Sequence, residues 1–210
     1  VVLRQSGAAA LYEIWLQGLT AAVTHRVVPK ALWGSMRGWP VIKVLDAVAH
    51  PTQDVFGTEP EKARNELLLD TLKSAHQQLV TLEGSDASKW AWDKIHVVEF
   101  RHALDQAPGG KKLFDLGPIA RPGDDYTINA TGFYAGGYRQ VAGASYRELM
   151  DLSGWDNSVA VNVPGQSGQP ASSHYSDLLP LWSEGHYFPL SYSRTAVQKY
   201  TTDKLVLEPK

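Results

Sequence analysis

The chain of 210 residues contains no cysteine. This absence excludes disulfide frameworks, thiolate zinc sites and a cysteine nucleophile. No apolar run approaches the roughly 18 residues that a membrane-spanning helix needs. An excess of positive charge is also lacking, because 20 Lys and Arg stand against 22 Asp and Glu, for a formal net charge of −2. The composition therefore argues against a nucleic-acid partner and against a polybasic membrane anchor.

What the chain does contain is typical of a globular protein. Apolar residues make up 43% of the sequence and charged residues 20%, which is unlike a disordered chain. A chain of this length buries about 70% of its unfolded surface, enough for one hydrophobic core. The seven Trp and nine Tyr indicate large packed surfaces or aromatic-lined pockets.

The first third of the chain has the periodicity of helices, from Ala8 to about Leu82. Its first helix is marked by an apolar face, with Ser6 as N-cap and Pro29 beyond its end. That face consists of Leu11, Trp15, Leu19 and Ala22. A loop over residues 33–40 leads to a second predicted helix, Val41–Val48, which His50-Pro51 ends.

A third helix follows. Thr58 and Glu61 have the spacing of a capping box at its start. An apolar stripe at steps of four and three residues predicts its buried face. The stripe consists of Leu68, Leu72, Ala75, Leu79 and Leu82.

After Gly84 the pattern changes to short β-like segments separated by Gly and Pro. The predicted strands cover residues 95–101, 126–130, 144–152 and 158–163, with a possible last strand at 205–207. Short helices are predicted over residues 176–184 and 193–200. The expected fold class is α+β in a single segment, residues 1–210, with 1–90 mainly helical and 91–210 mainly strands with short helices.

One serine has a sequence context that invites comparison with hydrolases. Gly165-Gln166-Ser167-Gly168 resembles the nucleophile elbow, but the elbow's second glycine should come one residue later. His174 and Asp177 are close in sequence, yet a catalytic triad is assembled in space. We favour the simpler interpretation, a tight glycine turn followed by a helix capped by Ser176.

Metal and phosphate sites have little support in the sequence. His96, Glu99 and His102 have ligand chemistry, but a strand would separate the two histidines by about 20 Å. Two acidic pairs, Asp54 with Glu59 and Asp124 with Asp125, do not match a calcium loop. No phosphate-binding glycine motif follows a strand and opens a helix. We therefore predict no metal or cofactor site within this chain.

The last third carries an ordered set of motifs that is more specific than this chemistry. They are Gly143–Arg147, Asp151–Ser158, Asn162–Pro170, Ser173–Trp182, Phe188-Pro189-Leu190 and Ser193-Arg194. Their succession resembles the C-terminal end of the β subunit of the penicillin acylase (penicillin amidase) family. Earlier segments fit the same register, namely Leu11–Leu16, Phe100-Arg101-His102 and Asp125–Ala130. The resemblance covers essentially the whole chain.

This resemblance implies an N-terminal-nucleophile hydrolase with a four-layer αββα core. Members of the family are made as a precursor that cuts itself into α and β subunits. The N-terminal Ser of the β subunit attacks an amide carbonyl with its own α-amine as base, and an oxyanion hole holds the developing charge. Substrates are N-acyl compounds such as β-lactam side-chain amides or acyl-homoserine lactones. A periplasmic or secreted location is the family expectation, as is calcium in the complete enzyme, with ligands outside this chain.

The chain departs from the family at its first residue, because Val1 has no hydroxyl group. The nucleophile and the oxyanion asparagine belong to parts absent here, so no catalytic residue is carried over and the isolated segment is expected to be inactive. Its expected partners are the missing N-terminal part of the β subunit, the α subunit and a small N-acyl amide. The alternative is a stand-alone binding or scaffold domain derived from the same fold, without catalysis.

Two groups of residues can be assigned from the family register. Trp33, Ser35 and Arg37 lie in a loop expected to approach the leaving-group side of the substrate. The second group matches the family's most recognisable signature and is expected to be mainly structural. It consists of Gly165, Gln166, Ser167, Gly168, His174, Tyr175 and Asp177.

Overall fold

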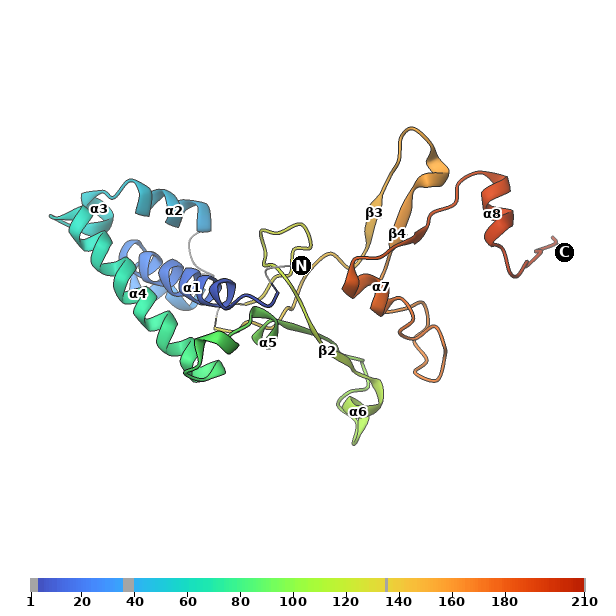
Figure 1. The fold of residues 1–210 in the computed structure, drawn as a ribbon, viewed down its shortest axis with the longest axis horizontal. Coiled ribbons are helices and arrows are strands. Elements are labelled where there is room, and N and C mark those ends of the chain that lie inside the picture. Colours follow the sequence, from blue (N-terminus) through green and yellow to red (C-terminus); the bar gives the residue numbers. More distant parts are fainter. Residues whose placement is uncertain (1–3, 36–39, 135, 210) are drawn as a thin grey trace. The chain divides into compact units, whose positions relative to one another are not determined.

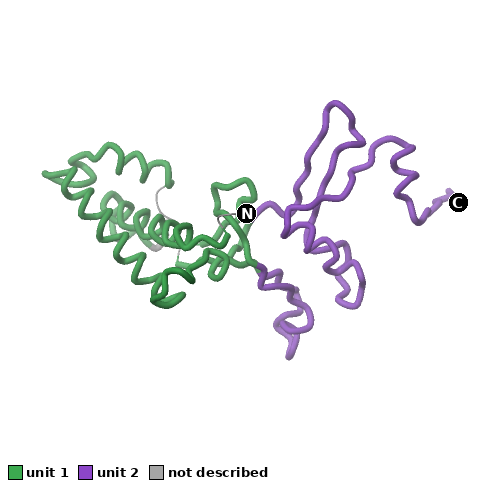
Figure 2. The backbone as a smooth tube through the Cα atoms, in the orientation of Figure 1, with its two compact units in different colours: residues 1–98, 120–142 green, residues 99–119, 143–210 purple. Residues whose placement is uncertain are grey.

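The computed structural model describes residues 4–35, 40–134 and 136–209 of the chain. Helices dominate the first part and antiparallel strands follow, as the sequence predicts. The chain divides into two compact units (Figure 2). Unit 1 comprises residues 1–98 and 120–142, and unit 2 comprises residues 99–119 and 143–210. The chain therefore passes between the units three times.

Unit 1 contains most of the helices (Figure 1). They are α1 (Gly7–Val27), the 3-10 helix η1 (Lys30–Ser35), α2 (Val41–Ala49), α3 (Gln53–Phe56), α4 (Pro60–Glu83), the 3-10 helix η2 (Ala87–Lys89) and α5 (Trp92–Ile95). The prediction of α1 is confirmed, including its cap, because the Ser6 hydroxyl accepts a hydrogen bond from the Ala9 amide at 3.1 Å. The prediction of α2 is also confirmed, with His50 as its C-cap.

The capping box predicted for α4 is wrong. The N-cap residue is Glu59, which makes no side-chain capping bond, and Pro60 is the first helical residue. Proline favours this first position because its ring fixes φ and because the amide it lacks would have no partner there. Of the predicted apolar stripe, Ala75 and Leu79 are buried, whereas Leu72 and Leu82 remain exposed.

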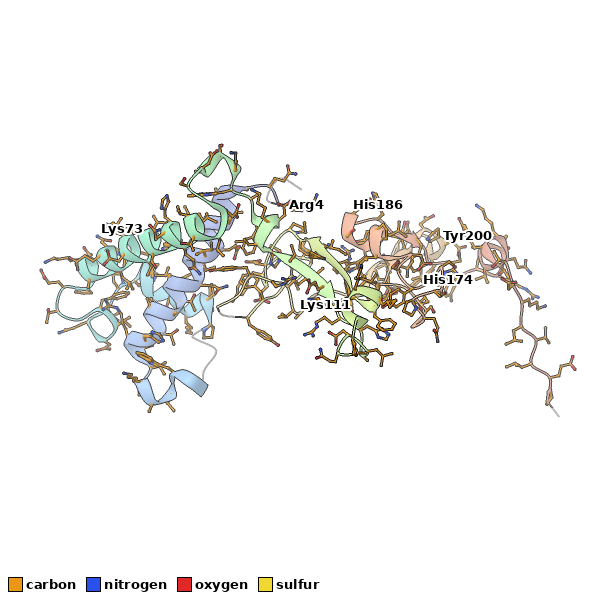
Figure 3. The ribbon with its side chains drawn as sticks, turned by 90° about the horizontal axis from the view of Figure 1, so that it is seen from below. Arg4, Lys73, Lys111, His174, His186 and Tyr200 are labelled. Atoms are coloured by element: carbon orange, nitrogen blue, oxygen red, sulfur yellow. The ribbon has the colours of Figure 1, made fainter. Side chains whose placement is uncertain are left out.

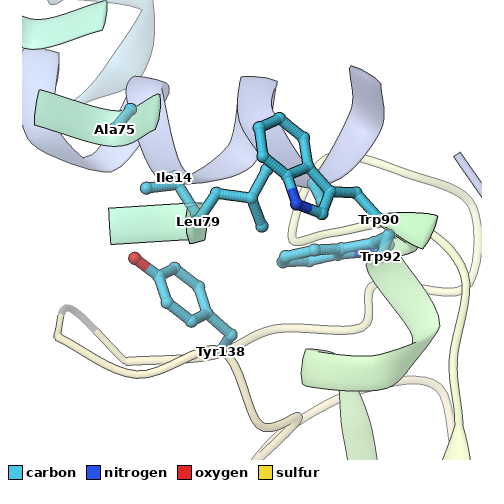
Figure 4. Close-up of a cluster of buried hydrophobic side chains, with 7 residues drawn as sticks. Ile14, Ala75, Leu79, Trp90, Trp92 and Tyr138 are labelled. Carbon is cyan, nitrogen blue, oxygen red and sulfur yellow. The ribbon is translucent and has the colours of Figure 1, made fainter. Parts of the chain in front are cut away.

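The core of unit 1 lies where α1 and α4 meet the segment after α4 (Figure 4). Its buried residues are Ala10, Ile14, Ala75, Leu79, Trp90, Trp92 and Tyr138. Trp92 is the largest fully buried side chain among the described residues, and its indole nitrogen donates to the carbonyl of Gly123 at 2.9 Å. A smaller cluster of Leu19, Val23 and Val44 joins α1 to α2.

The strands form two small sheets. One pairs β1 (Val97–Phe100) with β2 (Leu116–Ala120). The other lies in unit 2 and has the order β3-β4-β5, with all pairs antiparallel. Its strands are β3 (Arg147–Leu149), β4 (Val159–Val161) and β5 (Phe188–Pro189). Unit 2 also contains α6 (Gly110–Phe114), the 3-10 helix η3 (Trp155–Asn157), α7 (Leu179–Glu184) and α8 (Arg194–Tyr200).

Four predictions for the second half need correction. Residues 205–207 have no regular structure, so the possible last strand there is not formed in the described part of the chain. Residues 126–130 form turns rather than a strand, because the Asp124 carboxylate accepts from the Tyr126 amide at 2.9 Å. Such a local bond competes with strand pairing. Only Arg147–Leu149 of the strand predicted over 144–152 is paired. Finally, α7 begins at Leu179 with Pro180 in its first turn, so Ser176 does not cap it.

The core of unit 2 is built around Trp182, a buried residue of α7. Its indole nitrogen donates to the carbonyl of Ala144 at 2.9 Å, and the Phe100 ring meets it edge-on at 5.6 Å between centroids. The guanidinium of Arg147 lies 5.5 Å from the centre of the same indole, within cation–π range.

Among the described residues, we find no helix with the length and hydrophobicity that crossing a membrane requires.

Candidate functional site

The family signature forms a closed loop in unit 2. The Ser167 amide donates to the carbonyl of His174 at 3.0 Å, and the Leu178 amide donates to that of Pro164 at 3.2 Å. Gly165 lies against the opposite side of this loop, so closely that a Cβ there would be 2.3 Å from the His174 carbonyl oxygen. The loop therefore closes through backbone contacts that only a glycine at position 165 permits.

The polar side chains of this loop make local contacts. The Nδ1 of His174 donates to the Asp177 carboxylate at 2.8 Å, on an exposed surface (Figure 3). The Ser167 hydroxyl accepts from the Gln169 amide at 3.1 Å. Within residues 164–178, all of which the structure describes, no hydrogen bond joins the Ser167 hydroxyl to the His174 ring. A histidine–carboxylate pair is thus present without the nucleophile contact that a triad needs.

Tyr175 fastens the same loop to another part of unit 2. Its hydroxyl donates to the carbonyl of Phe114, at the end of α6. The ring of Phe114 in turn stacks on His102, with 4.9 Å between centroids. Gln166 and Gly168 are exposed at the loop's surface. The mainly structural role of the signature stays a prediction.

The predicted substrate loop lies partly outside the described residues. Trp33 is half-buried in η1, where its indole nitrogen donates to the carbonyl of Val28 at 2.9 Å. Its ring stacks on that of His25, with 3.7 Å between centroids. Arg37 and the side chain of Ser35 are outside the described residues. The binding role of these three residues therefore remains a prediction.

The histidines near β1 are each engaged by the backbone. His96 is fully buried, and its Nδ1 donates to the carbonyl of Tyr138 at 2.6 Å. Burial lowers the pKa of His96, which keeps the imidazole neutral. His102 accepts from the Leu104 amide at 3.1 Å through its Nδ1. Across residues 4–35, 40–134 and 136–209, no three His, Asp or Glu side chains are placed to hold a metal ion.

The most unusual ionisable group is one that the sequence analysis did not single out. Glu13 lies half-buried on α1, facing the turn that contains Asp124 and Asp125. Burial, and then the charges of these two aspartates, raise the pKa of Glu13 to about 8. The same neighbourhood raises the pKa of Tyr12, mainly through burial. Glu13 is therefore largely protonated near neutral pH, where it can donate a proton.

We expect the stability of the protein to fall as Glu13 loses its proton. Because the folded-state pKa lies above the ordinary value of 4.5, the folded chain binds the proton more tightly between pH 4.5 and about 8. The free energy of unfolding should decrease across this window and stay low above it. Glu13→Gln should remove this loss, which is of the order of a few kcal/mol. Urea unfolding on either side of the window measures the difference.

The matched control is Glu66→Gln, on the exposed side of α4. It should leave the pH dependence unchanged. A Glu13→Gln variant with the same slope as the parent chain would show that Glu13 keeps its charge when folded.

Comparisons with known proteins agree on one family. The family model described as penicillin amidase matches residues 3–199. The penicillin acylase 2 proenzyme of Pseudomonas sp. (strain SE83) is 31% identical over 212 residues, which cover 96% of this chain and 26% of that protein. The acyl-homoserine lactone acylase QuiP of Pseudomonas syringae pv. tomato is 29% identical over 163 residues, which cover 76% of this chain and 20% of that protein.

A solved structure shows the same fold. It is the thermostable penicillin G acylase from Alcaligenes faecalis, with a TM-score of 0.51 and 20% sequence identity. The match covers 98% of this chain and 39% of that chain. This chain therefore spans about a quarter of the length of the sequence relatives it matches, and less than half of the structural one.

Proposed function

Because this chain belongs to the penicillin amidase family, we propose that it is one part of an amidohydrolase that cleaves the amide bond of N-acyl compounds. The observation that carries the proposal is the family match over residues 3–199. The two kinds of sequence relative, a penicillin acylase and acyl-homoserine lactone acylases, support the same reaction class. Both names describe enzymes that remove an acyl group.

The proposed reaction is acyl transfer to a serine carried by another part of the enzyme. The serine oxygen bonds to the amide carbonyl carbon, the C–N bond breaks, and the amine leaves with the serine's proton, relayed by the α-amine. Water then releases the carboxylic acid and restores the serine. In this scheme the described residues form a framework, because the Ser167 hydroxyl and the His174 ring already have partners within their own loop.

The remaining parts of the proposal come from the family. The proposed partners are the N-terminal part of the β subunit and the α subunit, and the proposed location is the periplasm or the exterior. Calcium is proposed for the complete enzyme with ligands outside this chain, and the described residues offer no set that fits it. Trp33, Ser35 and Arg37 remain the proposed substrate contacts.

The experiment that tests the proposal begins with the protein as it occurs in its source. Intact mass and gel filtration identify the polypeptides that accompany this chain, and a chromogenic phenylacetyl amide and a long-chain acyl amide measure turnover. Co-elution with further family polypeptide and hydrolysis of either amide would support an acylase. A species of this chain alone, without turnover, would favour a binding or scaffold domain.

A substitution at Ser167 separates the framework role from a catalytic one. Ser167→Ala in the complete enzyme should leave turnover within about twofold of the parent, because its hydroxyl caps the Gln169 amide at an exposed turn. Removal of a nucleophile would instead reduce kcat by about a thousandfold or more. Ser173→Ala, at an exposed serine of the same region, is the control. A loss confined to Ser167→Ala would overturn the proposed location of the nucleophile.

A further inference from the structure

The end of unit 2 contains an apolar segment whose side chains are largely exposed. Leu205, Val206 and Leu207 are 85%, 62% and 84% exposed. They belong to a stretch without regular structure, residues 201–209, that continues beyond α8 (Figure 1). Between residues 194 and 209, Ala196 alone is not exposed. Exposing three adjacent large apolar side chains to water is unfavourable in free energy, because burying each of them would be favourable.

The sequence around this segment has the alternation of a strand with one buried face. Successive side chains of a strand point to opposite faces. In the order Lys204, Leu205, Val206, Leu207, Glu208, the two leucines share one face. Val206 shares the other face with the two charged residues. The leucine face is wholly apolar over about 7 Å, whereas the valine face is bounded by a lysine and a glutamate.

The backbone of this segment is also unpaired. No hydrogen bond links residues 204–208 to another described residue. A strand with free amides and carbonyls and one apolar face pairs with the open edge of a sheet. Pro209 follows directly and cannot donate a ladder hydrogen bond, which would end the pairing there.

We propose that residues 204–208 add as a strand to a sheet edge of the remaining family polypeptide, with Leu205 and Leu207 facing that polypeptide's core. The length of the structural relative indicates which polypeptide this strand pairs with. The solved penicillin G acylase matches 98% of this chain, yet more than half of its own chain lies outside the match. The inference rests on one part of the proposed function, namely that further polypeptide of the same family accompanies this chain.

The test measures backbone hydrogen exchange of the peptide covering residues 203–209. The native protein, with its accompanying family polypeptide, is compared with the chain of residues 1–210 alone. The amides of Leu205, Val206 and Leu207 should exchange at least about tenfold more slowly in the native protein. Equal exchange in the two samples would overturn the proposal. Protection in the chain alone would also overturn it, because the strand would then pair within this chain or with a second copy.

Three variants of the native protein test which face is buried. Leu205→Asp and Leu207→Asp should each abolish most of the protection, by about tenfold or more, because each removes a buried leucine from the proposed face. Val206→Asp introduces the same group on the other face and should retain the protection. Equal loss in all three variants would overturn the facing of the leucines. The comparison of unmodified proteins remains decisive if a variant fails to assemble.

The same samples separate this inference from the proposed function. Protection without hydrolysis of an acyl amide would leave the strand in place and remove the proposed activity. Hydrolysis without protection would support the proposed activity and overturn the proposed strand.

Discussion

Replacing Trp92 with alanine is expected to lower the free energy of unfolding by about 3–5 kcal/mol. The side chain is 1% exposed and lies in the core of unit 1. Its ring stacks on His96 with 4.6 Å between centroids and meets Phe133 and Tyr138 edge-on. The substitution leaves a large cavity and also leaves the Gly123 carbonyl without its indole donor. Urea unfolding followed by circular dichroism measures the loss.

Trp155→Ala is the control for this effect. Trp155 is 46% exposed in η3 and contacts Tyr192 with 5.7 Å between ring centroids. Its removal should cost less than about 1 kcal/mol. Similar losses for the two tryptophans would mean that the aromatic cluster around Trp92 contributes no more to stability than a surface contact.

A second large effect is expected at Gly165. Gly165→Ala would place a Cβ 2.3 Å from the His174 carbonyl oxygen and 2.8 Å from the Tyr175 backbone. Because both obstacles are backbone atoms, the loop must open, at a cost of about 3 kcal/mol or more. The hydrogen bond between the Ser167 amide and the His174 carbonyl should be lost with it. Thermal unfolding and exchange of the Ser167 amide measure the two consequences.

Gly168→Ala supplies a control within the same loop. Nothing lies within 4 Å of a Cβ at this position, and neither glycine has a positive φ. The two substitutions therefore differ only in the available space. Gly168→Ala should be nearly neutral, and a loop that tolerates both changes would contradict the structural role assigned to the signature.

Helices were predictable where local signals agree with tertiary packing. The start of α1 follows from the Ser6 cap, and the start of α8 from Ser193, whose hydroxyl accepts from the Ala196 amide at 3.2 Å. The start of α4 was predicted wrongly because two signals compete there. The capping-box spacing favours Thr58 as the N-cap, whereas Pro60 favours the first helical position, and the helix begins at Pro60. Local patterns thus predicted the helices themselves better than their first residues.

The strands and the electrostatic site depended on contacts that periodicity does not encode. β2 contains Gly117 and Pro118, which argue against a strand, yet it pairs with β1. The pKa of Glu13 is raised first by burial and then by the charges of Asp124 and Asp125, which lie far away in the sequence. No spacing rule links these residues. The family was identified from an ordered set of motifs, whereas the chemistry of single residues did not indicate any reaction.

The threefold passage of the chain between its units affects how the protein is made. On the ribosome, residues 1–98 are made before the rest of unit 1, which is complete only when residue 142 has been synthesised. Tyr138, which belongs to the core around Trp92, is among the late residues. The core around Trp92 therefore stays incomplete while the first part of unit 2 leaves the exit tunnel. For the same reason, no single cut in the polypeptide can separate the two units from each other.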